Sequence, residues 1–144
     1  MNTFTHRVEV RWADLDPNFH VLHSKYYDYG ATSRMACLVQ YGLTPAVMRE
    51  HNLGPILLKE SCEFRREIHF GDALEVRLWI REHRPDYSRF VIEHELIKNE
   101  SILSARISVE IAWIDTTLRK MAKLPEPLQE MIKRMPHQLT NSNE

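Results

Sequence analysis

Residues 8–42 read VEVRWADLDPNFHVLHSKYYDYGATSRMACLVQYG, and three patterns in this stretch decide the fold. Apolar and charged side chains alternate over residues 7–12, which is the period-two pattern of a half-buried strand. The turn-forming run DLDPN at residues 14–18 must then end that strand. From about Ser24 the spacing becomes helical, and Gly42 stands where a helix C-terminus favours positive φ. The apolar positions at helical steps of three or four are Tyr27, Ala31, Met35 and Leu38.

The loop between the predicted strand and helix is rich in side chains that carry chemistry. It contains two carboxylates and two histidines: Asp14, Asp16, His20 and His23. The helix start that follows offers unpaired N–H groups and a partial positive charge. A carboxylate that faces such donors across a small gap can attack a carbonyl, or activate water against it. The loop and the first helical turn are therefore the predicted active site.

Composition limits the function classes. The chain has 144 residues, which is most simply one domain, and its 19 Lys and Arg against 20 Asp and Glu give no general basic face for nucleic acid. No apolar run reaches the ~18 residues of a membrane span, and no signal-like apolar core follows Met1. Cys37 and Cys62 lie within apolar periodicities without metal-type spacing, which favours buried thiols in a reducing compartment. We therefore expect a cytoplasmic protein.

The rest of the chain predicts strands and two further helices. Thr44 and Pro45 are typical of the start of a short second helix. Alternation then predicts four consecutive antiparallel strands, within residues 56–70, 74–81, 90–96 and 103–113, followed by an amphipathic helix that ends near Met135. We expect residues 1–135 to form a single domain and residues 136–144 to be a disordered tail.

One long helix is available to cover one apolar face of the predicted sheet. This helix carries small side chains that permit a close approach to strands: Gly30, Ala31, Ser33, Ala36 and Cys37. The economical arrangement is one long central helix wrapped by a curved, antiparallel five-stranded sheet. The predicted fold class is therefore α+β, with the hotdog architecture.

Two stretches resemble a known family. The run DLDPNFHVLHSKYY, with Arg34 further along, resembles the opening signature of the 4-hydroxybenzoyl-CoA thioesterase-like hotdog family of acyl-CoA thioesterases. The run FRREIHFGDALEV, residues 64–76, is similar to the strand–turn–strand of the same family. The resemblance runs from about Val8 to Asp115. A Glu that is common in the family's central helix is replaced here by Ala31.

The resemblance implies a reaction and a set of site residues. It implies hydrolysis of a fatty or aromatic acyl-CoA thioester, with Asp16 as the catalytic carboxylate and His23 supplying a backbone N–H to the thioester carbonyl. We expect the substrate to be bound by neighbouring residues of the loop and first helical turn: His20, Leu22, Ser24 and Tyr26. The substrate would be an acyl thioester of CoA or of an acyl-carrier protein. No cofactor is expected, because coenzyme A is part of the substrate. The assembly would be a homodimer, or a homotetramer made of two dimers.

Several alternatives stay open at this stage. Asp16 can act as a nucleophile, as a general base, or only as an Asx turn, which an Asp before Pro favours. Asp14 is better suited to bracing the loop, and His20 to a structural role. We expect no metal site, because the loop carboxylates and histidines lack the helical His pair or the Cys companions of typical zinc sites. The rival functions are a hotdog enoyl-CoA hydratase and a non-catalytic protein that binds acyl thioesters.

Overall fold

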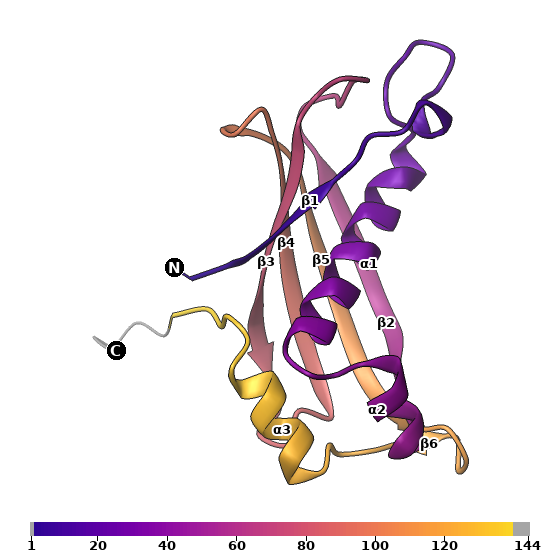
Figure 1. The fold of residues 1–144 in the computed structure, drawn as a ribbon, viewed down its shortest axis with the longest axis vertical. Coiled ribbons are helices and arrows are strands. Elements are labelled where there is room, and N and C mark those ends of the chain that lie inside the picture. Colours follow the sequence, from indigo (N-terminus) through magenta and orange to yellow (C-terminus); the bar gives the residue numbers. More distant parts are fainter. Residues whose placement is uncertain (1, 140–144) are drawn as a thin grey trace.

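The structure is a computed structural model, and it describes residues 2–139. A long helix, α1 (His23–Gln40), lies against a curved antiparallel sheet, and two short helices, α2 (Pro45–Glu50) and α3 (Glu126–Lys133), lie near the opposite end of the molecule from the start of α1 (Figure 1). The main strands are β1 (Phe4–Val8), β2 (Leu53–Phe64), β3 (Leu74–His83), β4 (Arg89–Lys98) and β5 (Ile102–Asp115). The predicted α+β hotdog architecture is confirmed.

The order of strands in the sheet differs from the order in the chain. The sheet runs β1-β3-β4-β5-β2, and the two-residue strand β6 (Lys120–Met121) pairs with β5. The expectation of four consecutive antiparallel strands is therefore wrong at its first step, because β2 pairs with β5 and not with β3. Residues 65–73 instead cross from one edge of the sheet toward the other. This crossing passes the start of α1, and it brings distant side chains to that end.

Helix α1 approaches the sheet closely at Gly30. A Cβ atom added at Gly30 would lie 3.4 Å from Ile107 Cδ1 of β5, so the helix and the sheet are already in close contact there. The buried positions of the helix are Tyr26, Tyr29, Gly30, Ser33, Cys37 and Leu38. The predicted apolar face is therefore wrong at Ala31, which is exposed. The buried face combines large and small side chains, and the apolar periodicity misses it because it does not count Gly30 and Ser33.

The first strand lies earlier than the sequence predicts. β1 ends at Val8, which pairs with Leu74, the first residue of β3. Val10 is buried, but Trp12 is 65% exposed and opens a single 3₁₀ turn, η1 (Trp12–Asp14). The alternation over residues 7–12 therefore extends past the strand. The strand ends at Val8 because β3 begins at Leu74 and offers no further residue to pair with it.

The chain after α3 is ordered for longer than expected. Ile80 of β3 donates its N–H to the carbonyl of Pro136 and accepts the N–H of Gln138, at 2.9 and 2.7 Å. Because β1 pairs with β3 only as far as Leu78, this part of the β3 edge is open to another partner. The predicted disordered tail therefore does not begin at Pro136. Its remainder, residues 140–144, lies outside the described residues.

The core between α1, α3 and the sheet is one cluster of buried side chains that includes Cys37, Trp113 and Ile132. Burial raises the pKa of the Cys37 thiol to about 12, so it stays protonated and packs as a small apolar group.

No helix in the described part of the chain is both long and apolar enough to cross a membrane.

Candidate active site

The start of helix α1 is open to an external hydrogen-bond acceptor. The helix begins at His23, and the N-cap residue, Leu22, has no side-chain oxygen with which to accept the first N–H groups. No acidic side chain lies in the first turn. Because the first four N–H groups of a helix lack intrahelical partners, this end can bind an oxygen that carries negative charge.

A hollow of about 300 Å³ lies beside this helix start. Its lining comes from α1 and the residues just before it, and from the chain where it leaves β2: Val21, His23, Tyr26, Phe64, Arg65, Arg66 and Glu67. The rings of Tyr26 and Phe64 meet at 5.0 Å between centroids and form one apolar wall. A larger hollow of about 400 Å³ lies between β1 and the turn before β3, but it contains none of the predicted site residues.

Asp16 closes a tight turn in the loop before the helix. Its Oδ1 accepts the N–H groups of Asn18 and His20, at 2.8 and 3.1 Å, and its own N–H donates to the carbonyl of His20 at 2.7 Å. Phe19 completes the turn with a left-handed φ of 66°. Asp16 therefore has the Asx-turn geometry. Its carboxylate is half-buried and is not part of the lining of the hollow at the helix start.

Asp14 is buried beneath this loop, at 1% exposed. It accepts hydrogen bonds from the Tyr29 hydroxyl at 2.9 Å and from the Arg11 guanidinium, also at 2.9 Å. Burial alone would raise the pKa of the Asp14 carboxyl, but the hydrogen bonds from Arg11 and Tyr29 outweigh it and hold this pKa below its usual value. The charged carboxylate ties the loop to α1, which is the bracing role that the sequence favours.

Comparison with known proteins places this arrangement in a family. The sequence model of the thioesterase-like superfamily matches residues 10–132. The chain belongs to the thioesterase-like superfamily. The resemblance seen in the loop and helix signature is thus confirmed, and the match covers the open helix start, the hollow beside it and most of the sheet.

Solved structures of similar proteins share the fold of this superfamily member. A 1,4-dihydroxy-2-naphthoyl-CoA thioesterase from Synechocystis is 27% identical, with a TM-score of 0.82 over 92% of this chain and 97% of that one. The Staphylococcus aureus protein SAV2348, solved in complex with CoA, is 21% identical, with a TM-score of 0.86 over 98% of this chain and 90% of that one. A gentisyl-coenzyme A thioesterase is 19% identical, with a TM-score of 0.77 over 91% of this chain and all of that one.

The hollow contains some of the predicted site residues and not others. His23 and Tyr26 line it, whereas Leu22 is half-buried at the N-cap and Ser24 is exposed without lining it. His20 instead contacts Glu67, with 3.1 Å between Nε2 and Oε2. The prediction missed Phe64 and Glu67, which also line the hollow. No local signal identifies these two residues, because their place depends on where the chain crosses the sheet.

Proposed function

We propose that this member of the thioesterase-like superfamily hydrolyses the thioester of a fatty or aromatic acyl-CoA to a free acid and CoA. The observation that carries the proposal is the open start of α1 beside a hollow that has one apolar wall, formed by Tyr26 and Phe64. A thioester carbonyl placed there accepts an N–H near His23. One such donor typically stabilises the transition state by about 3 kcal/mol.

Asp16 is the proposed catalytic carboxylate. The turn holds Oδ1 of Asp16 through two N–H groups, which fixes the carboxylate at the end of the molecule where α1 begins. This carboxylate does not line the hollow, so the proposal requires that a bound thioester extend from the hollow to Asp16. Asp16 either attacks the carbonyl carbon, forming a mixed anhydride that water then hydrolyses, or it takes a proton from the water that attacks. In both routes the C–S bond breaks and CoA leaves as a thiolate, so no strong general acid is required.

The test is thiol release from short, long and aromatic acyl-CoA esters by the full chain. The naphthoyl-CoA thioesterase among the similar structures makes aromatic esters the first to try. We expect turnover of at least one class. Absence of thiol release across the whole panel, together with measurable binding of the esters, would instead identify a non-catalytic binding protein. Hydration of crotonyl-CoA without thiol release from any ester would identify a hydratase.

We propose that Arg65 and Arg66 bind the phosphates of CoA. Both line the hollow at the helix start, and both also line an adjoining hollow of about 620 Å³. The backbone N–H groups of both residues donate to the carbonyl of Ser104, which fixes this corner of the chain. Arg65 also pairs with Glu63 at 2.8 Å, so Arg66 is the better candidate to receive a phosphate.

Replacing Arg66 by alanine is expected to raise KM for acyl-CoA roughly tenfold and to leave kcat nearly unchanged, because a phosphate contact binds ground state and transition state equally. The matched control is Arg84→Ala, in the turn between β3 and β4 at the opposite end of the sheet. The same acyl group on pantetheine, which lacks the nucleotide phosphates, should show no difference between Arg66→Ala and the parent. An equal loss on both substrates would refute the phosphate contact.

We further propose that two chains associate through strand β2. This strand is at the edge of the sheet and carries exposed apolar side chains at Leu57, Leu58 and Phe64. Its hydrogen-bonding edge and these side chains are both available to a second copy. Light scattering at micromolar concentration should give the mass of a dimer or of a dimer of dimers. Leu57→Glu should shift that mass toward the monomer, and a monomeric parent protein would disprove the association.

A further inference from the structure

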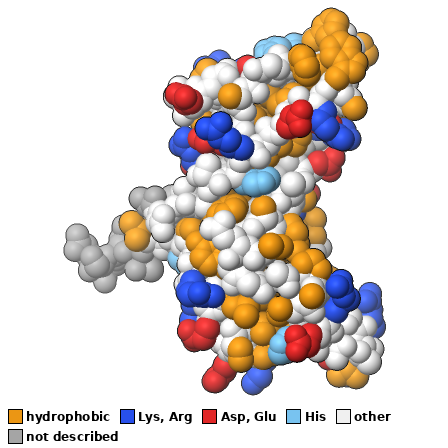
Figure 2. Space-filling view, viewed as in Figure 1, with side chains coloured by type: hydrophobic (Ala, Val, Ile, Leu, Met, Phe, Trp, Pro, Cys, Tyr) orange, Lys and Arg blue, Asp and Glu red, His pale blue; other side chains and the backbone are white. Residues whose placement is uncertain are grey.

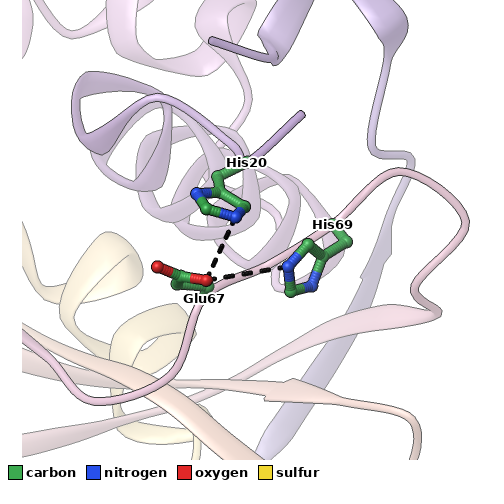
Figure 3. A group of neighbouring side chains, drawn as sticks. All are labelled: His20, Glu67 and His69. Atoms are coloured by element: carbon green, nitrogen blue, oxygen red, sulfur yellow. Dashed lines mark ion pairs between the residues drawn. The ribbon is translucent and has the colours of Figure 1, made fainter. Parts of the chain in front are cut away.

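Three side chains with metal-ligating atoms converge beside the hollow at the helix start, and one of them, Glu67, also lines it. His20 comes from the loop before α1, and Glu67 and His69 come from the crossing segment, residues 65–73 (Figure 3). Oε2 of Glu67 lies 3.1 Å from Nε2 of His20 and 3.7 Å from Nε2 of His69. All three ligand atoms lie within 4.8 Å of one another, and no other set of three or more does so in residues 2–139.

The backbone fixes this convergence. His20 and His69 are directly opposite each other in a short antiparallel bridge, and the N–H of Val21 donates to the carbonyl of Ile68 at 2.8 Å. Opposed residues of such a pair present their side chains on the same face, and a residue two positions away in an extended segment does so too. Glu67 is two positions before His69. The three side chains therefore lie together because of the chain path and not by chance rotation.

We propose that His20, Glu67 and His69 form a binding site for a divalent transition metal ion of the zinc class. In a tetrahedral zinc site with bonds of about 2 Å, ligand atoms are about 3.3 Å apart, and small side-chain rotations bring the observed distances to that value. Two imidazoles and one carboxylate favour zinc or a similar ion over magnesium or calcium, which take oxygen ligands. The site is partly exposed, so water completes the coordination.

A carboxylate stands behind one of the ligands. Oδ2 of Asp72 lies 3.7 Å from Nδ1 of His69 and accepts the backbone N–H of the same residue at 2.8 Å. Its other oxygen accepts the Asn99 amide at 3.0 Å, so the Asp72 side chain is fixed. A metal-binding histidine usually directs its second ring nitrogen toward such a group, which orients the ring and raises its basicity. His69 therefore presents Nε2 to the ion.

This set differs from the one considered from the sequence. The Asp14 carboxylate is held by Tyr29, and Oδ1 of Asp16 by N–H groups of its own turn. Neither carboxylate belongs to the group of converging ligand atoms. The ion links the loop that carries Asp16 to Glu67, which lines the hollow at the helix start. The site does not depend on the proposed hydrolysis, and a protein with no thioesterase activity would bind the ion equally well.

The experiment uses the tag-free full chain after removal of metal by a chelator. Zn²⁺ is titrated in competition with a chromogenic indicator, and Co²⁺ is titrated while its visible absorption bands are followed. We expect one ion per chain and a melting temperature that rises with Zn²⁺ concentration. His69→Gln and Glu67→Gln should each weaken Zn²⁺ binding at least tenfold and abolish that rise.

The matched control is His51→Gln, which removes an exposed histidine at the end of α2, far from the cluster. This variant should bind one Zn²⁺ with unchanged affinity. All substitutions are on partly exposed side chains, and circular dichroism of each metal-free variant verifies the fold. The proposal is overturned if the parent protein binds no ion, or if its affinity is the same in His69→Gln and Glu67→Gln as in His51→Gln.

Discussion

Replacing Asp16 by asparagine is expected to lower kcat for acyl-CoA hydrolysis by roughly 10²–10⁴-fold while the protein stays folded. Asparagine keeps a side-chain Oδ1, which can accept the N–H groups of Asn18 and His20 and so preserve the turn. It cannot attack a carbonyl or take a proton from water. The assay is thiol release with the ester that the parent protein turns over fastest, and equal melting temperatures verify the fold.

The variant Asp16→Ala separates the two roles of this residue. Alanine removes both the carboxylate and the acceptor of the turn. If Asp16 is catalytic, asparagine and alanine both lose activity. If it only shapes the loop, asparagine retains nearly full activity and alanine alone loses it. The second pattern would remove Asp16 from the mechanism.

Acid should destabilise the folded protein through one buried histidine. His94 of β4 is 0% exposed, and its Nδ1 donates to the carbonyl of Ile107 at 3.0 Å. Nε2 therefore accepts, and the Arg34 guanidinium lies 3.4 Å from it and pairs with Glu60 at 3.7 Å. Burial, and then the positive charge of Arg34, lower the pKa of His94 to about 3. The imidazole is thus neutral in the folded state.

Between pH 6.5 and pH 3 the unfolded chain binds a proton at His94 that the folded chain does not bind. Stability therefore falls as the pH falls, by about 1.4 kcal/mol per pH unit. We expect a loss of about 2 kcal/mol between pH 6.5 and pH 5, measured by urea denaturation. His94→Asn should remove most of this slope, because its amide can still donate to Ile107 and has no charge to gain.

The control for the pH dependence is His51→Asn, at an exposed position, which should keep the full slope. His137 is half-buried, and burial lowers its pKa too, so it contributes a dependence that both variants share. Asp14 and Asp72, whose pKa values are held low, add their effect only at more acidic pH. A slope that is equal in His94→Asn and His51→Asn would contradict the assignment to His94.

Much of the fold is predictable from local chemistry. Thr44 caps α2 by accepting the Val47 N–H at 3.2 Å, and Gly42 adopts a φ of 101° after α1, as their residue types require. Strands β3, β4 and β5 lie where the alternation predicts them, because both the pattern and the turns agree. These elements are determined by residues close to one another in the sequence, so the sequence alone predicts them.

The pairing of strands is not predictable in the same way. The alternation of β2 shows that it is a strand, but it does not say whether β3 or β5 lies beside it. Several apolar side chains of β2 are exposed, so the apolar positions of this strand do not all pack against the core of this chain. If β2 is assumed to pair with β3, residues 65–73 are read as a turn. The sequence then does not indicate that they cross the sheet and line the hollow.

The same distinction between local and long-range contacts applies to the candidate site. The sequence locates the loop, the helix start and the bracing role of Asp14, because these follow from turn and helix chemistry. It does not reveal that His20 faces Glu67 and His69, since they are almost fifty positions away and meet only through the bridge between His20 and His69. The sequence indicates the Asx turn of Asp16 as one alternative, and the structure shows that Oδ1 of Asp16 accepts the N–H of Asn18 in that turn.

We expect the hollow at the helix start to form late in folding, because it depends on the crossing segment. The hairpins β3–β4 and β4–β5 join neighbours in the sequence and can form early, whereas β2 must find β5 from far along the chain. A chain trapped with β2 folded back on β3 would keep most of its sheet and look native by circular dichroism. Its hollow at the helix start would nevertheless be incomplete, because Phe64 and Glu67 would not lie beside His23 and Tyr26.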